Sequence, residues 1–192
     1  PPATQLFNIA TVDLRGPMPD IAGLDRHFYT TSACGVCGKA SLDQIEEIGG
    51  PPIGAGPRVD ASLIRSLPER LRADQKVFER TGGLHAAALF DADGNVLCVR
   101  EDVGRHNAMD KVVGWGLLED TLPFTERIVL VSGRASYELV QKAVRAGASI
   151  FCAVSAPSSL AVDVAQRFGI TLVAFLRNAS FNIYTGEERI TL

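Results

Sequence analysis

The stretch IVLVSGRASYELVQKAVRAGASIFCAVSAPSSLAVDVAQRFGITLVAFL, residues 128–176, decides the fold of this chain. Its apolar runs are continuous rather than alternating, which is typical of strands buried on both faces of a parallel sheet. Segments with helical spacing separate these runs, so the stretch reads as repeated β-α-β units with helices on both faces of the sheet. The predicted strands are 128–131, 149–154 and 170–176, and the predicted helices are 136–146 and 159–168.

The residues before this stretch predict an antiparallel edge to the same sheet. Apolar segments at 85–90 and 96–100 flank the polar turn at 91–95, a pattern typical of a β-hairpin. Proline suits the first turn of a helix, so we expect one helix to begin at Pro68. The predicted helices of this region are 61–67, 69–80 and 105–118.

A linker rich in glycine and proline, residues 49–57, divides the chain into two parts. The predicted domains are an N-terminal portion, 1–57, and an α/β domain, 58–192. The chain opens on Pro1-Pro2 without a methionine, so we expect the N-terminal portion to be truncated.

The composition excludes several classes of protein. The 192 residues are 46% hydrophobic and carry a net charge of −3, which argues against a nucleic-acid-binding protein. Four cysteines are too few for a disulfide scaffold of this size, and Cys98 and Cys152 lie in apolar runs typical of a core. No apolar run reaches the roughly 20 residues of a membrane helix. We therefore expect a reducing, cytoplasmic location.

The carboxyl ends of the predicted strands carry hydroxyl, small and charged residues. Ligands of open α/β sheets bind beyond these ends, where helix N-termini and arginines favour phosphates. From the sequence pattern alone, the candidates for binding phosphate are Ser132, Arg134 and Arg177. The segments concerned are 100–107, 132–136, 155–159 and 176–180.

Cys34 and Cys37 form a C-x-x-C pair in the segment TSACGVCGK, residues 31–39. Structural zinc needs four ligands, and neither a second cysteine pair nor paired histidines occur in the sequence. Dithiol redox chemistry expects the pair at a helix start within a βαβ unit, whereas this pair precedes the α/β region. Lys39 would favour a thiolate that carries sulfur. Zinc, redox, sulfur-carrying and inert interpretations all remain open on the residues alone.

His106 follows the predicted hairpin in the segment EDVGRHN, residues 101–107. The plain interpretation is a helix start capped by Asp102. The functional one is a histidine of lowered pKa that acts as proton donor or base at a strand exit. A zinc deaminase would need a glutamate at position 108 and further cysteines, which are absent. Neither a dinucleotide-binding nor a P-loop glycine motif occurs.

The residues after 175 allow two interpretations. The segment FLRNASFNIY, residues 175–184, has the pattern of a C-terminal strand and hairpin, and it also has an arginine-bearing loop that could close over a ligand. The pattern slightly favours the hairpin.

Together these segments resemble the FdhD family of sulfurtransferases needed for active formate dehydrogenase. The similarity is carried by TSACGVCG, EDVGRHNAMDKVVG, VSGRASYELVQKA, SAPSSLAVDVAQRFGITLVAFLR and FNIYTGEERI. It implies a cytidine-deaminase-like α/β fold, a three-layer sandwich without the deaminase metal. It also implies a sulfur relay from a cysteine desulfurase to the molybdenum cofactor of formate dehydrogenase, bis-molybdopterin guanine dinucleotide.

The resemblance assigns roles to residues of this chain. Cys34 would carry a persulfide and Cys37 would assist or resolve it, and we expect a homodimer with no metal of its own. A chaperone that only binds the cofactor, or a C-x-x-C oxidoreductase, would be the alternatives. The resemblance implies that the cofactor-binding segment is Phe175, Leu176, Arg177, Asn178, Ala179 and Ser180. The sequence pattern adds three further candidates for the same site, which are Arg134, Ser132 and His106.

Overall fold

The computed structural model describes residues 13, 15–17, 52–177 and 180–192, and the chain divides into two units, residues 1–35 and 36–192. In the first unit, Asp13 and residues 15–17 are exposed. Cys34 and Cys37 lie outside the described residues, as do Asn178 and Ala179. All that follows concerns the second unit.

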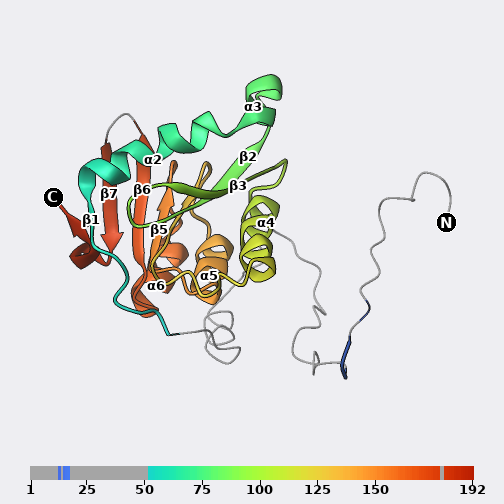
Figure 1. Cartoon of the computed structure of the whole chain (residues 1–192). Coiled ribbons are helices and arrows are strands. Elements are labelled where there is room, and N and C mark those ends of the chain that lie inside the picture. The colour runs from blue at the N-terminus through green and yellow to red at the C-terminus, as the bar shows by residue number, and fades with distance from the viewer. Residues whose placement is uncertain (1–12, 14, 18–51, 178–179) are drawn as a thin grey trace. The chain divides into compact units, whose positions relative to one another are not determined.

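A six-stranded sheet in the order β3-β2-β4-β5-β6-β7 forms the centre of this unit (Figure 1). The pairs β4–β5 and β5–β6 are parallel, whereas β2 is antiparallel to both β3 and β4, and β7 is antiparallel to β6. The strands are β1 Val59–Asp60, β2 His85–Phe90, β3 Val96–Asp102, β4 Ile128–Val131, β5 Ile150–Ala153, β6 Thr171–Arg177, β7 Ser180–Thr185 and β8 Ile190–Thr191.

Helices cover both faces of this sheet, which gives the three layers that were predicted. Helices α4, α5 and α6 pack on one face, and α2 packs on the other (Figure 1). The helices are α2 Ala61–Ala73, α3 Lys76–Thr81, α4 Arg105–Leu118, α5 Tyr137–Arg145 and α6 Ser159–Arg167, followed by the short 3-10 helix η2 Glu187–Arg189.

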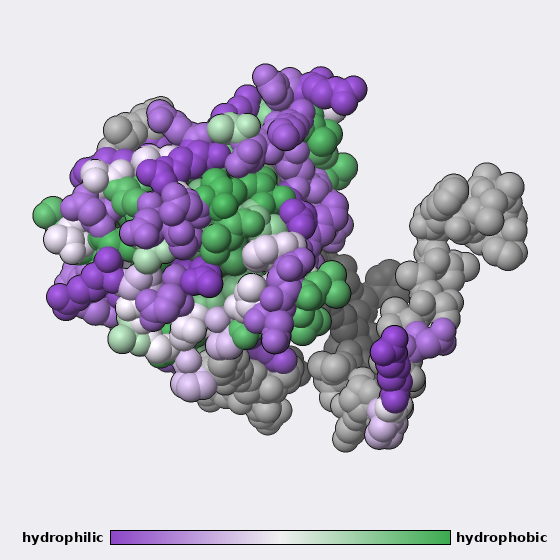
Figure 2. Space-filling view, viewed as in Figure 1, coloured by the Kyte–Doolittle hydropathy of each residue, from purple (hydrophilic) through white to green (hydrophobic). Residues whose placement is uncertain are grey.

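The side chains of the central strands divide between two cores because successive strand residues point to opposite faces. On β4, Val129 and Val131 belong to the core beneath α4, α5 and α6. Ile128 and Leu130 belong to the core beneath α2. Both sets are buried, which explains why the strand is a continuous apolar run. Figure 2 shows that some apolar surface stays visible on the face below α2.

The sheet is mixed, because the three strands predicted for the β-α-β units are parallel and antiparallel pairs flank them on both sides. Only β4, β5 and β6 run parallel. The predicted hairpin of β2 and β3 joins the sheet through β2, which adds two antiparallel pairs at one side. The predicted C-terminal hairpin is confirmed and adds the third, between β6 and β7. The five-residue turn at 91–95 lets β2 pair with β3 without a crossover helix, whereas β3 and α4 lie between β2 and β4 in the chain.

The prediction that a helix begins at Pro68 is wrong. Helix α2 runs through Pro68, and the break lies instead after Ala73. Proline inside a helix removes one backbone hydrogen bond. Here Ile64, Leu67 and Leu71 form a buried stripe on both sides of the proline, so packing on the sheet keeps the helix continuous.

Strand β8 and Arg189 join the two ends of the α/β unit by contacts with residues 54–60, which we call the C-terminal clasp. Strand β1 pairs in parallel with β8, and the Arg189 guanidinium, which is 7% exposed, donates hydrogen bonds across the junction. Its Nε donates to the Ala55 carbonyl at 2.6 Å and its Nη2 to the Gly54 carbonyl at 3.1 Å. Its Nη1 donates to Thr171 Oγ1 at 3.1 Å. The segment that leads into β1 is therefore fixed by a residue near the end of the chain.

Helix α4 packs closely on Phe124 through a glycine. A Cβ added at Gly116 would lie 2.4 Å from the Phe124 ring, which is fully buried. We predict that Gly116→Ala lowers the free energy of unfolding by about 1–3 kcal/mol because the ring has no room to move. Chemical denaturation measures this, with Gly114→Ala as the matched control, since no atom lies within 4 Å of a Cβ there. Equal effects of the two substitutions would contradict the packing argument.

In the part of the chain that the structure describes, no helix is long and apolar enough to cross a membrane.

Candidate functional site

The loops that follow β4 and β5 meet the last residues of β6 at one edge of the sheet, which we call the carboxyl edge. Backbone hydrogen bonds tie these loops together, from Ser155 to Gly133 at 3.2 Å, from Ser158 to Ala135 at 3.0 Å and from Phe175 to Ser155 at 3.1 Å. The predicted convergence of the strand ends is therefore present. These hydrogen bonds join the backbone of the strand ends into one continuous surface at the carboxyl edge.

His106 lies at this edge, on the first turn of α4, against the N-terminus of α5. Its Nε2 is 3.2 Å from Ser136 Oγ and 3.6 Å from Glu138 Oε2. Burial, followed by the neighbouring Arg105, lowers the pKa of His106 below its usual value. The expected direction of that shift is confirmed, and the imidazole is neutral at pH 7. Ser136 is the N-cap of α5 but its side chain does not cap the helix, because the hydroxyl lies against His106.

The prediction that Asp102 caps α4 is wrong. The N-cap is Gly104, with no side-chain cap, and Asp102 lies two residues earlier. Its carboxylate accepts from Lys111 Nζ at 2.6 Å, from the Gly104 N–H at 2.8 Å and from Asn107 Nδ2 at 3.2 Å. The Lys111 contact, with these hydrogen bonds, holds the pKa of Asp102 at about 2. Asp102 therefore fixes the loop before α4 as a permanent anion.

Two buried polar atoms beside His106 have no hydrogen-bond partner among the described residues. They are Arg105 Nε and Glu138 Oε2. An unpaired buried donor or acceptor is costly, so such atoms mark a place where a ligand or water can supply the missing partner. Both lie on the first turns of α4 and α5, where backbone N–H groups also favour anions.

Phe175 has a backbone conformation that is unusual for a phenylalanine, with φ at +53°. A register shift between Ala174 and Arg177 accompanies it. Ala174 and Phe175 consequently pack on the same core, the one beneath α4, α5 and α6, whereas Leu176 enters the core beneath α2. Strain of this kind costs on the order of 1–3 kcal/mol and is found at functional sites.

The shift at Phe175 decides which face of the sheet Arg177 occupies. A slip of one residue moves every following side chain to the opposite face. The Arg177 guanidinium lies over the Phe175 ring, 6.0 Å from its centroid, and so on the side of α5 and α6. Arg177 and Arg134 are both exposed. They form two cationic groups at the carboxyl edge.

A cleft of about 990 Å³ opens on the other side of this edge, between α2, α3 and the strand ends. Ser132 and Val154 contribute to its wall from the ends of β4 and β5, and His85 contributes from the start of β2. Ser132 Oγ accepts from the Ala86 N–H at 2.9 Å, which leaves the Ser132 hydroxyl proton free to donate.

The structure brings most of the predicted site residues to the carboxyl edge, but on two sides. Ser132 faces the cleft, whereas His106, Phe175 and Arg177 lie on the side of α4, α5 and α6. Leu176 is 1% exposed within the core, so only its backbone could contact a ligand. Ser180 is exposed, and its hydroxyl donates to the Arg177 carbonyl at 3.1 Å.

Sequence reasoning missed the cleft residues His85, Gln75 and Phe78. Their signal was weak, since His85 reads as the first residue of an apolar strand. Only the antiparallel pairing of β2 with β4 places the start of β2 beside the end of β4. The glycine pair Gly82-Gly83 just before His85 was the one available pointer.

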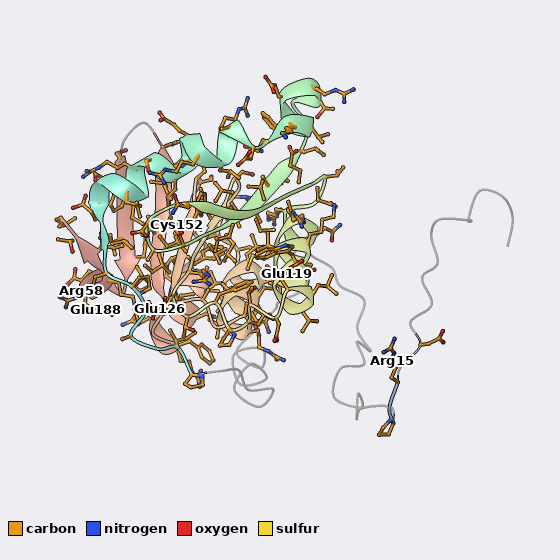
Figure 3. All side chains as sticks on the ribbon, viewed as in Figure 1. Arg15, Arg58, Glu119, Glu126, Cys152 and Glu188 are labelled. Carbon is orange, nitrogen blue, oxygen red and sulfur yellow. The ribbon has the colours of Figure 1, made fainter. Side chains whose placement is uncertain are left out.

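Cys98 and Cys152 are both buried, as their apolar neighbours predicted. Cys152 lies inside the sheet (Figure 3). Burial raises the pKa of each thiol, and the effect is greatest for Cys152. Neither can supply a thiolate at neutral pH. Among the described residues, no group of three or more histidine, cysteine and acidic side chains is arranged to hold a metal ion.

Comparison with known proteins gives consistent matches along the chain. A profile of the FdhD/NarQ family matches residues 7–191. The sulfur carrier protein FdhD of Streptomyces avermitilis is 58% identical over 177 residues, which cover 91% of this chain and 62% of the relative. That of Mycobacterium tuberculosis is 54% identical over 187 residues, which cover 96% of this chain and 68% of the relative.

A solved structure is also similar. It is the crystal structure of a proposed formate dehydrogenase accessory protein from Desulfotalea psychrophila, with a TM-score of 0.69 and 31% identity. The match covers 78% of this chain and 62% of that one. The chain thus spans a little under two thirds of the length of the first of these relatives and of the solved structure.

Proposed function

We propose, from the premise that this chain belongs to the FdhD/NarQ family, that it is a sulfur carrier which serves the maturation of formate dehydrogenase. The observation that carries the proposal is the distribution of its four cysteines. Cys98 and Cys152 are buried thiols of raised pKa, which leaves Cys34 and Cys37 as the pair able to react. Relatives more than 50% identical are named sulfur carrier protein FdhD.

In the proposed reaction, the Cys34 thiolate attacks the terminal sulfur of a persulfide on a cysteine desulfurase. The S–S bond of the donor breaks, the donor cysteine leaves as a thiolate, and Cys34 becomes a persulfide. No net oxidation occurs in this step, since one persulfide is exchanged for another. The positive charge of Lys39 favours the Cys34 thiolate.

Cys37 would release the sulfur. Its thiolate attacks the inner sulfur of the Cys34 persulfide, which forms a Cys34–Cys37 disulfide and expels the outer sulfur as hydrosulfide. The two cysteines supply the two electrons that reduce this sulfur to sulfide. A dithiol reductant then restores both thiols. The receiving substrate is the molybdenum cofactor, bis-molybdopterin guanine dinucleotide.

The carboxyl edge is the proposed place where that cofactor binds. Arg134 and Arg177 would contact its phosphates, together with the N-termini of α4 and α5, beside which Arg105 Nε has no partner among the described residues. His106 is neutral at pH 7 and could donate a hydrogen bond or accept one. The proposed cofactor-binding segment, residues 175–180, includes the strained Phe175.

The partners that follow from this proposal are a cysteine desulfurase, formate dehydrogenase and a second copy of the chain. All three are expected in the cytoplasm. Incubation of the full chain with a cysteine desulfurase and cysteine tests the sulfur step. Peptide mass spectrometry should find one added sulfur atom on Cys34, and an unchanged mass would overturn the proposal.

Guanosine diphosphate tests the cofactor step, because it carries the nucleotide part of the proposed cofactor. We predict that it raises the melting temperature of the wild-type chain and that Arg177→Ala weakens its binding about tenfold or more, through loss of a charge-assisted contact to phosphate. Arg145→Ala is the matched control, since Arg145 is exposed at the far end of α5. Equal binding by the Arg177 and Arg145 variants would contradict this assignment.

A further inference from the structure

The two ring nitrogens of His106 lie in different surroundings. Nε2 is in contact with α5, at 3.2 Å from Ser136 Oγ and 3.6 Å from Glu138 Oε2. Nδ1 makes no hydrogen bond to any residue of 52–177 or 180–192. The imidazole is 29% exposed, so part of the ring is open to a ligand at the carboxyl edge.

Glu138 decides which of these nitrogens carries the proton. In a neutral imidazole one nitrogen is an N–H donor and the other has a lone pair that accepts. Glu138 Oε2 is buried without a hydrogen-bond partner among the described residues, and it lies close to Nε2. A carboxylate oxygen only accepts, so it repels a lone pair on Nε2 and attracts an N–H there. The proton of His106 therefore lies on Nε2, and Nδ1 keeps the lone pair.

Ser136 cannot make this choice, although it is the nearer of the two side chains. A hydroxyl both donates and accepts, so Ser136 Oγ can pair with Nε2 in either tautomer. With the proton on Nε2, the Ser136 oxygen accepts it. The preference for one tautomer consequently comes from Glu138.

The charges around His106 keep the ring neutral, which preserves the lone pair on Nδ1. Burial and then Arg105, the preceding residue of α4, lower the pKa of His106. From α5, Glu138 raises that pKa and Lys142 lowers it. Lys142 is itself paired with Asp110 of α4, at 2.5 Å. Because the net shift is downward, the imidazolium does not form at pH 7 and Nδ1 remains an acceptor.

We propose that Glu138 is a positioning residue of the carboxyl edge, which holds the His106 proton on Nε2 and leaves Nδ1 to accept a hydrogen bond from a hydroxyl or N–H group of the ligand. This inference rests on the proposed function, because the ligand meant is the proposed cofactor. Arg134 and Arg177 would attract its anionic groups, whereas His106 would contact a neutral donor. The three side chains are not a hydrolytic triad, since the acid and the serine meet the same ring nitrogen.

Nitrogen NMR of the full chain with isotope-labelled histidine shows which ring nitrogen carries the proton. We expect Nε2 alone in the wild type at neutral pH. Glu138→Met keeps the length of the side chain without its charge, so both tautomers should appear and the His106 pKa should fall. Ser136→Ala should keep the proton on Nε2. Glu119→Met is the control, because Glu119 is exposed at the far end of α4 (Figure 3).

Two replacements of His106 test the role of Nδ1 in ligand binding. The amide of asparagine is as many bonds from Cβ as Nδ1 is, and the amide of glutamine as many as Nε2. His106→Asn therefore keeps an acceptor at the position of Nδ1, whereas His106→Gln does not. Isothermal titration calorimetry should find guanosine diphosphate binding within about twofold of the wild type for His106→Asn. Binding to His106→Gln should be about three- to tenfold weaker, through loss of one hydrogen bond.

Three results would overturn the proposal: a proton on Nδ1 in the wild type, a single tautomer in Glu138→Met, or binding by His106→Gln that equals or exceeds that of His106→Asn. If Glu138→Met does not fold, Glu138→Gln replaces it, because an amide can donate to Nε2 as well as accept and should also mix the tautomers. Failure of the wild type to bind guanosine diphosphate would refute the proposed cofactor step. The tautomer of the free chain would still decide the role of Glu138.

Discussion

Replacing Cys34 with alanine is expected to abolish sulfur loading and to leave formate dehydrogenase inactive in a strain that depends on this chain. The reason is chemical, because alanine has no sulfur with which to form a persulfide. Loading is measured by mass spectrometry and maturation by formate dehydrogenase activity in cells that produce only the variant. The expected effect is loss to background in both assays.

Three further variants test whether the loss of sulfur loading and of maturation depends specifically on the Cys34 thiol. Cys98→Ala should load as the wild type does, since Cys98 is buried and its thiol pKa is raised. Cys37→Ala should still accept sulfur but release it slowly, because the resolving thiol is gone. A Cys34→Ala/Cys37→Ala double variant that restores full formate dehydrogenase activity would show that the chain acts as a chaperone for the cofactor. Disulfide turnover with a dithiol reductant, without nucleotide binding, would instead identify an oxidoreductase.

Arg189→Met is expected to cost about 3 kcal/mol of folding free energy, the largest stability effect among the substitutions considered. The guanidinium is buried, and its removal leaves the carbonyls of Gly54 and Ala55 without their donors. Methionine nearly preserves the volume, so the loss reports the hydrogen bonds. Denaturant unfolding of the full chain measures the change.

Arg58→Met is the control for this prediction, because Arg58 lies in the segment that Arg189 anchors but its own side chain is exposed (Figure 3). Its expected effect is within about 0.5 kcal/mol. A difference of less than about 1 kcal/mol between the two variants would mean that the clasp contributes little to stability. Hydrogen exchange at Val59 and Ile190 would then be unchanged as well.

The central fold could be predicted from sequence because its signals are local. The strands β4 and β5 are apolar throughout, β6 is apolar between its end residues Thr171 and Arg177, and the helices between these strands have clear periodicity. What could not be predicted depends on distant pairing. The antiparallel contact of β2 with β4 moves His85 to the carboxyl edge, and packing on the sheet carries α2 through Pro68.

The candidate site was predictable to a similar degree. Strand ends with serine and arginine identified the carboxyl edge, because parallel strands bring their ends together. The backbone of Phe175 was not predictable, since a positive φ at a non-glycine residue is held by its surroundings. That conformation separates Arg177 from Ser132, so the predicted residues occupy two sides of one edge. Gln75 was missed because no residue beside it signals burial.

The C-terminal clasp also sets an order of events during synthesis. Arg189 and its partner Ala55 are 134 residues apart, so this contact cannot form until nearly the whole described chain has left the ribosome. The hairpin of β2 and β3 and the β-α-β units need only nearby partners and can form earlier. Closing so long a loop carries an entropic cost that rises only slowly with length. The anchorage of residues 54–60 therefore cannot precede the synthesis of residue 189, and a chain that ends before that residue would have the strands of the central sheet but no partner for β1.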